Sequence, residues 1–264
     1  MKNVISKDHH SDSGKTALVT GASSGIGRAA SLHLAYEGIQ VALVGRNREN
    51  LLKTADDIYE IGGQCEIIQA DLAEEQEIGR TVEHTVEKFG RLDILVNSAG
   101  IIGSGSIENT SSEQWDSMLQ INLKSVFLMI KCAIPHLEKT KGAVVNVSSV
   151  TGLRSFPNMI SYCVSKAGVD QLTRCAALEL APKGIRINAV NPGVIRTELH
   201  MRGGMDEQAY SEFLERCKDT HPLGRAGEPE EAAELIAFLA TERSGWITGA
   251  CIPIDGGRAQ TCAR

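Results

Sequence analysis

Residues 15–27 of this 264-residue chain read KTALVTGASSGIG, a short apolar run that ends in a glycine-rich turn. The run 15–20 predicts a buried strand, and the residues from Gly25 to about Gly38 predict a helix. Glycines let the backbone approach a pyrophosphate, and a helix N-terminus favours its negative charge. The order strand, glycine turn, helix is typical of a dinucleotide-binding unit, although a tight turn without a ligand would use the same residues.

The rest of the chain repeats this unit of strand and helix, which predicts one α/β domain over residues 14–264 behind a polar N-terminal tail at 1–13. The pattern lapses at 198–225, where apolar residues are mixed with charges and glycines. This segment suits a lid over a substrate, and a plain surface helix is the alternative. Further strands are predicted at 40–44, 65–70, 92–96, 143–148, 185–190 and 250–254.

Composition limits the possible partners. The chain is 42% hydrophobic and 23% charged, with a net charge of -6 and a pI of about 5.7, which indicates a soluble globular protein and argues against nucleic acid. The 7 cysteines show no spacing typical of a metal site and predict reduced thiols. The pair His9-His10 lies in the predicted tail. No apolar run approaches the ~20 residues of a membrane span, so we expect no membrane partner. The reduced thiols fit a cytoplasmic protein, and the lack of metal-site spacing predicts no bound metal.

Ser149, Tyr162 and Lys166 form the candidate catalytic group. Ser149 follows the predicted strand 143–148, and the carboxyl ends of parallel strands are where ligands bind in open sheets. Tyr162 and Lys166 are spaced i, i+4, so on a helix they share one face. A phenol, an ammonium and a hydroxyl that meet there can protonate a carbonyl oxygen or deprotonate an alcohol. Each residue also has a structural alternative, as a core tyrosine, a surface charge and a helix cap.

The ends of the other strands carry candidate cofactor contacts. Gly45 stands where an acidic residue would bind the ribose of NAD, and Arg46 follows it, which favours the 2′-phosphate of NADP. Arg46 could instead begin a solvated helix. Asp71 can bind the adenine, cap the next helix, or do both. Asn122 lies among apolar residues, where an amide needs hydrogen-bond partners, so a purely structural amide is its alternative.

These motifs together resemble the short-chain dehydrogenase/reductase family over about residues 14–257. The glycine motif TGxxxGxG matches residues 20–27, the NNAG motif matches 97–100 with Ser98 for the second asparagine, and the PG motif matches 192–193. The resemblance implies a Rossmann-type, doubly wound sheet of about seven parallel strands and a homotetramer or homodimer. Its branch contains 3-oxoacyl-carrier-protein, tropinone and carbonyl reductases, in which glycine followed by arginine goes with NADP(H).

The resemblance also implies the roles of individual residues. The family's catalytic tetrad falls on Asn122, Ser149, Tyr162 and Lys166, with Tyr162 as the proton donor. The ammonium of Lys166 and the positive nicotinamide of the oxidised cofactor are expected to lower the pKa of Tyr162, and Asn122 is expected to hold a water that resupplies protons. The expected cofactor contacts are Gly21, Ser23, Ser24, Gly25, Ile26, Gly27, Arg46, Asp71, Leu72, Asn97, Ala99, Gly100, Tyr162, Lys166, Pro192, Gly193, Ile195 and Thr197.

Three functions are compatible with the sequence. The first is hydride transfer between NADP(H), or less readily NAD(H), and a small-molecule ketone or secondary alcohol, with reduction of a hydrophobic carbonyl as the favoured direction. The second is reduction of a 3-oxoacyl carrier protein or acyl-CoA, which needs a basic landing patch such as Lys139, Lys141 and Lys183. The third is a dinucleotide-binding regulator without catalysis. Phe156, Met159 and the methionines of 198–225 predict an apolar pocket, in which Arg154 could bind an anion.

Overall fold

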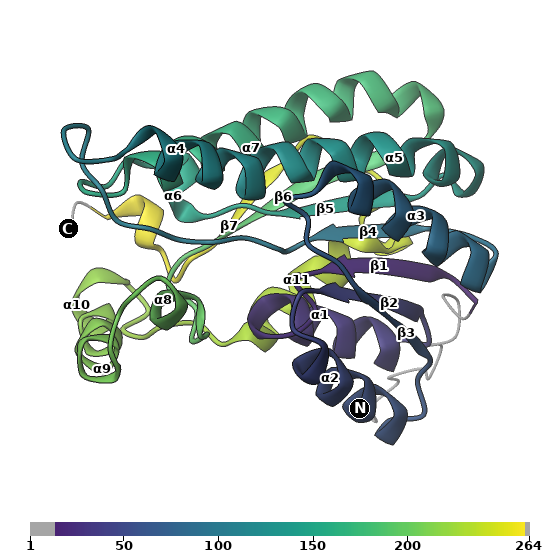
Figure 1. Ribbon diagram of the computed structural model, residues 1–264, viewed down its shortest axis with the longest axis horizontal. Helices are drawn as coiled ribbons and strands as arrows, with labels where there is room; N and C mark the ends of the chain where they lie inside the picture. The colour runs from purple at the N-terminus through teal and green to yellow at the C-terminus, as the bar shows by residue number, and fades with distance from the viewer. Residues whose placement is uncertain (1–13, 262–264) are drawn as a thin grey trace, which may run out of the picture.

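The computed structural model describes residues 14–261, and its seven strands form one parallel sheet in the order β3-β2-β1-β4-β5-β6-β7 (Figure 1). The predicted tail at 1–13, with His9-His10, lies outside the described residues. Each predicted strand is found, with ends shifted by a few residues. The strands are β1 Thr16–Thr20, β2 Gln40–Gly45, β3 Cys65–Gln69, β4 Ile94–Asn97, β5 Ala143–Val147, β6 Arg186–Pro192 and β7 Cys251–Ile254.

Helices cover both faces of the sheet, which confirms the predicted doubly wound architecture (Figure 1). One buried core joins the sheet to α1, α2 and α11, and a second joins it to α3, α5 and α7. Parallel strands buried on both faces read as continuous apolar runs, as this sequence does. The helices on the two faces are α1 Gly25–Tyr36, α2 Arg48–Glu60, α3 Glu75–Phe89, α4 Ser112–Leu119, α5 Ser125–Thr140, α7 Ile160–Leu180 and α11 Pro229–Ala240.

The order of the strands places a crevice beside β1. β1 pairs with β2 on one side and with β4 on the other, so the connections after β1 and β4 leave the sheet in opposite directions. Loops at such a reversal diverge and open a crevice at the carboxyl ends of the strands. The glycine turn after β1 and the residues after β4 and β5 therefore meet at one place.

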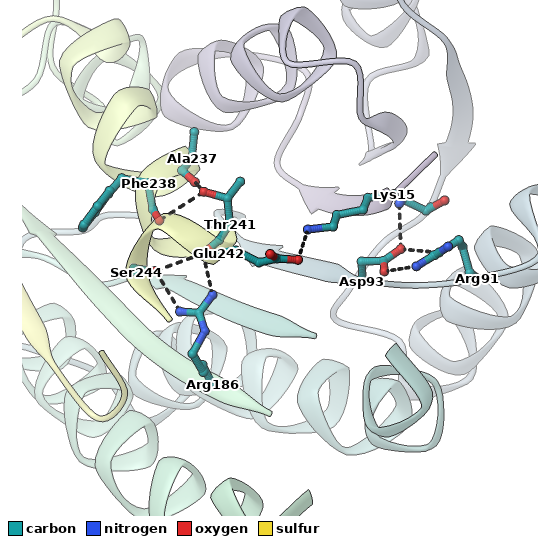
Figure 2. Close-up of polar contacts among 10 residues, drawn as sticks. Lys15, Arg91, Asp93, Arg186, Ala237, Phe238, Thr241, Glu242 and Ser244 are labelled. Carbon is teal, nitrogen blue, oxygen red and sulfur yellow. Dashed lines mark hydrogen bonds and ion pairs between the residues drawn. The ribbon is translucent and has the colours of Figure 1, made fainter. Parts of the chain in front are cut away.

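Polar contacts link the amino-terminal ends of the strands, on the side of the sheet away from the crevice (Figure 2). The carboxylate of Asp93 accepts a hydrogen bond of 2.9 Å from the amide of Thr16 and a two-pronged one from Arg91. Arg186 donates to the carbonyls of Leu239 and Thr241, 2.9 and 2.8 Å away, at the carboxyl end of α11. These contacts fix β1, β4 and β6 far from the crevice.

One helical run changes its hydrogen-bond pattern midway. The predicted helix from Ser112 is capped by Ser111 in a reciprocal pair with Gln114, and it continues to Thr140 through a π-helical turn, η1 Gln120–Lys124. A π turn inside an α-helix often marks a functional site. By length and composition this run of 29 residues could cross a membrane, which the sequence analysis did not predict. Core helices meet the same criterion, and its buried residues join the second core.

The segment 198–225 contains three short helices, α8 Leu199–Arg202, α9 Glu207–Glu215 and α10 Cys217–Thr220. Between β5 and α7 lies the short α6 Val150–Leu153, and the chain closes with a 3-10 turn, η4 Arg258–Gln260. Figure 1 shows α8 to α10 grouped beside the carboxyl ends of the strands.

Candidate active site

A cavity of about 520 Å³ occupies the crevice at the carboxyl ends of the strands. Its size is that of a small-molecule site. Seventeen of the eighteen cofactor contacts expected from the sequence line it, and the exception is the buried Asn97. The expected catalytic residue Asn122 does not line it either, because its side chain is buried behind the wall. Its walls come from the glycine turn, the ends of β2 to β6, the α6–α7 connection, the segment 198–225 and Arg258.

The glycine turn brings the backbone closer to its neighbours than a side chain would allow. A Cβ on Gly27 would lie 2.3 Å from the carbonyl oxygen of Gly21, and one on Gly21 would lie 2.9 Å from the amide nitrogen of Ala99. The turn is thus pressed against β4, and the first amides of α1, which have no partner within the helix, begin at the cavity wall. A backbone cradle at a helix N-terminus fits the pyrophosphate of a dinucleotide.

Ser149, Tyr162 and Lys166 meet at the cavity wall, as predicted. Ser149 follows β5 and its hydroxyl caps α6, accepting from the amide of Thr151 at 3.1 Å. Tyr162 and Lys166 project from α7, with the ammonium 5.8 Å from the centre of the phenol ring. Lys166 donates to the carbonyl of Val147 at 2.9 Å, so its charge is held where β5 ends.

Burial favours the neutral forms of both titratable groups. It raises the pKa of Tyr162 to about 12, and a hydrogen bond with Ser149 only partly opposes this. It lowers the pKa of Lys166 to about 8, against the carboxylate of Asp170. From the sequence we expect Lys166 and an oxidised nicotinamide to lower the pKa of the phenol. In the structure of the protein alone, the loss of water around the phenol is the largest influence on its pKa and raises it.

Asp170 forms a buried network behind these groups that the sequence analysis did not identify. The side-chain amide of Asn191 donates to both carboxylate oxygens of Asp170, at 3.0 and 2.9 Å, and to the carbonyl of Ser149 at 2.9 Å. Burial raises the pKa of Asp170. Asp170 follows Lys166 by one helical turn, and this spacing was the available signal, since it puts the carboxyl on the same face of α7 as Lys166.

Asn122 is fully buried in the π turn. Its side-chain oxygen accepts from the amide of Ile101 at 2.8 Å, and its nitrogen donates to the carbonyl of Ile101 at 2.9 Å and to the hydroxyl of Ser165 at 3.2 Å. A Cβ on Gly100 would lie 3.2 Å from the Asn122 oxygen and 3.7 Å from the Lys166 ammonium. Asn122 therefore fastens the loop after β4 beside Lys166, as its structural alternative describes, and the water relay stays a prediction.

Of the residues expected to contact the cofactor away from the catalytic group, Arg46 and Asp71 line the cavity, whereas Asn97 does not. Arg46 is exposed at the cavity rim and precedes α2, which Asn47 caps. Asp71 lines the cavity and accepts from the amide of Ala73 at 3.0 Å. The expectation that Asp71 caps α3 is wrong, because that cap position belongs to Glu74. The Asn97 side chain donates to Asn146 within the sheet at 2.9 Å.

The part of the cavity beyond Tyr162 is mainly apolar. Phe156, Met159 and Phe213 line it, whereas Met201 and Met205 do not. Arg154 does not line the cavity, and its Nη1 donates to the carbonyls of Arg258 and Ala259, at 2.9 and 3.3 Å, so the structure does not support the expected pairing with a substrate anion. Nothing local in the sequence indicated the lining residues His200, Arg202 and Arg258, which reach the cavity through tertiary folding.

Comparisons with known proteins agree with this geometry. A family model described as enoyl-(acyl carrier protein) reductase matches residues 21–259. Over 92% of its length the chain is 40% identical to a 3-oxoacyl-[acyl-carrier-protein] reductase of Thermotoga maritima, 97% of which is covered. Cyclohexanol dehydrogenase of an Acinetobacter strain is also 40% identical, over 92% of this chain and 94% of that protein.

Solved structures show the same fold. A short-chain dehydrogenase/reductase of unknown function from Caenorhabditis elegans, solved with cofactor, superposes with a TM-score of 0.89 at 36% identity, covering 95% of this chain and 97% of that one. Carveol dehydrogenase from Mycobacterium avium in complex with NAD has a TM-score of 0.89 at 28% identity, covering 94% and 99%.

Proposed function

The chain belongs to the short-chain dehydrogenase/reductase family, and on this basis we propose that it reduces a hydrophobic ketone to a secondary alcohol with NADPH. As a member of this family it is an oxidoreductase of alcohol and carbonyl groups. The observation that carries the proposal is that Ser149, Tyr162 and Lys166 share one cavity with the glycine turn.

The dinucleotide supplies the hydride when it is bound. The chain's own residues supply the proton and hold the carbonyl. Tyr162 keeps its proton at neutral pH because burial raises the pKa to about 12, so the phenol is ready to donate to the oxygen of a carbonyl that is being reduced. Ser149 donates a hydrogen bond to the same oxygen, and the positive charge of Lys166 stabilises the negative charge that develops there.

The preference for NADP(H) rests on Arg46. Its guanidinium stands at the cavity rim after β2, with Gly45 at the position where an acid would bind the ribose. The NAD complex of carveol dehydrogenase, at 28% identity, marks NAD(H) as the alternative. Fluorescence titration of NADPH and NADH with wild type and Arg46→Ala separates them. We expect the variant to weaken NADPH binding selectively, and equal or tighter NADH binding by wild type would refute the preference.

The apolar wall of Phe156, Met159 and Phe213 favours a hydrophobic small molecule as substrate. The name of the Thermotoga relative favours the alternative, a carrier-protein substrate. The expected landing patch of Lys139, Lys141 and Lys183 does not support it. Lys141 and Lys183 lie shortly before β5 and β6, at the amino-terminal ends of the strands, whereas the cavity is at the carboxyl ends. Lys183 is also paired with Glu138 at 2.6 Å.

Catalysis is tested by the fall of NADPH absorbance when a hydrophobic diketone is added. We expect Tyr162→Phe to bind NADPH like wild type and to lose about 10²–10⁴-fold in turnover, the usual contribution of a positioned acid. Turnover of the variant near the wild-type rate would exclude Tyr162 as the proton donor. NADPH binding without turnover of any diketone or acyl thioester in the wild type would favour the regulator alternative.

The proposal extends to the surroundings of the site. The segment 198–225 acts as a lid, Asn122 supports a proton relay, and the protein works in the cytoplasm as a homotetramer or homodimer. Light scattering in solution tests the assembly, and a monomer at micromolar concentration would contradict it.

A further inference from the structure

Arg202 makes a contact that the proposed chemistry does not use. It ends α8, and its Nη1 donates to the hydroxyl of Ser24 in the glycine turn at 3.0 Å, across a separation of 178 residues. Its Nη2 lies 2.5 Å from the carboxylate of Glu198. Both Ser24 and Arg202 line the cavity. The guanidinium thus connects the segment 198–225 to the wall that a dinucleotide's pyrophosphate would occupy.

The segment around Arg202 is braced on both sides of the cavity. The phenol of Tyr210 donates to the carbonyl of Thr197 at 2.9 Å and accepts from its amide at 3.1 Å, which ties α9 to the start of the segment. A Cβ on Gly25 would lie 3.0 Å from the Thr197 methyl carbon, and one on Gly203 would lie 2.7 Å from a side-chain carbon of Ile102. The backbone next to Arg202 therefore packs closely against the loop after β4.

The local charges favour an anion at this point. The first turn of α1 is Gly25-Ile26-Gly27-Arg28, and the amino end of a helix carries partial positive charge. Ser24, at the N-cap, makes no side-chain bond to this turn, and its hydroxyl accepts from Arg202 instead. A guanidinium is thus directed at the positive end of a helix, with the carboxylate of Glu198 as its balancing partner. An anion between guanidinium and helix would satisfy both.

We propose that Arg202 binds the pyrophosphate of the dinucleotide from the side of the lid, so that cofactor loading holds the segment 198–225 over the site. The planar fork of arginine matches phosphate oxygens, and a phosphate at α1 is within the reach that the Ser24 contact defines. This inference rests on the proposed function, because it requires a nicotinamide dinucleotide in the cavity. Arg202 would give the pyrophosphate a second contact, from a part of the chain far from the glycine turn.

The affinity test compares Arg202→Gln with Lys218→Gln, which removes an exposed lysine from α10, outside the cavity. NADPH and adenosine 2′-monophosphate, which has no pyrophosphate, are titrated into each. We expect Arg202→Gln to bind NADPH about tenfold more weakly, at the low end for a hydrogen bond to a charged group because the side chain is half exposed. Its affinity for adenosine 2′-monophosphate should stay unchanged, as should both affinities of Lys218→Gln.

The second readout is hydrogen exchange of the amides in 199–215 with and without NADPH. We expect NADPH to slow exchange there in wild type and in Lys218→Gln, and to do so much less in Arg202→Gln at a saturating concentration. Equal NADPH affinity in wild type and Arg202→Gln, or an equal loss for both ligands, would overturn the role of Arg202 while leaving the proposed function standing. Failure of wild type to bind NADPH or NADH would overturn both.

Discussion

Replacement of Lys166 by methionine should make the protein more stable while it abolishes activity. Burial lowers the pKa of Lys166 from 10.5 to about 8. At about 1.4 kcal/mol per pH unit, the buried ammonium therefore costs about 3 kcal/mol of folding free energy. Methionine has a similar length without the charge. It loses the hydrogen bond to the carbonyl of Val147, which contributes about 1 kcal/mol, so the net gain at pH 7 is about 2 kcal/mol.

The pH dependence of this gain has a definite sign. Because the folded-state pKa lies below that of the unfolded chain, the cost is complete below about pH 8, where both states carry the ammonium. It is relieved as the pH rises from 8 to 10.5, where both states are neutral. The advantage of Lys166→Met should therefore shrink over this range and become a deficit of about 1 kcal/mol, the lost hydrogen bond.

Urea unfolding without added dinucleotide, at equal protein concentration and at several values between pH 7 and 10.5, measures the difference. Lys218→Met is the matched control, because this lysine of α10 is exposed and forms a surface ion pair with Glu215, so its loss should change stability by less than about 0.5 kcal/mol. A variant less stable than wild type at pH 7, or a difference that does not change with pH, would refute the reasoning.

Two further predictions concern Asp170 and the glycines. The Asp170 carboxylate raises the pKa of Lys166, so Asp170→Asn should move the alkaline fall of the reduction rate to lower pH, and an unmoved rate–pH profile would show that the two groups do not interact. Gly27→Ala should lose at least about 1–3 kcal/mol of unfolding free energy, because its Cβ would lie 2.3 Å from the Gly21 oxygen. Gly79→Ala in α3, where a Cβ meets no atom within 4 Å, should gain up to about 1 kcal/mol, and similar melting temperatures for the two variants would contradict the steric argument.

Local sequence was sufficient for the secondary structure and for much of the site. Apolar runs such as the one around Leu18 and Val19 predict buried strands because parallel strands are covered on both faces. The spacing of Tyr162 and Lys166 fixes their common face because a helix repeats every 3.6 residues. The glycine turn follows from the same kind of argument, since its steric demands act on residues near in sequence.

Tertiary structure decided how distant segments meet and what their charges do. The reach of Arg202 to Ser24, the use of Arg154 on the carboxyl-terminal segment and the Asn191–Asp170 network all join residues far apart in the chain. The pKa of Tyr162 also rises against expectation, because desolvation depends on every atom packed around the phenol. The sequence by itself determined the strands, the helices and the candidate catalytic group, since these follow from local periodicity. Burial and long-range contact depend on the packed chain as a whole, so the protonation states and the lid contacts appeared only in the fold.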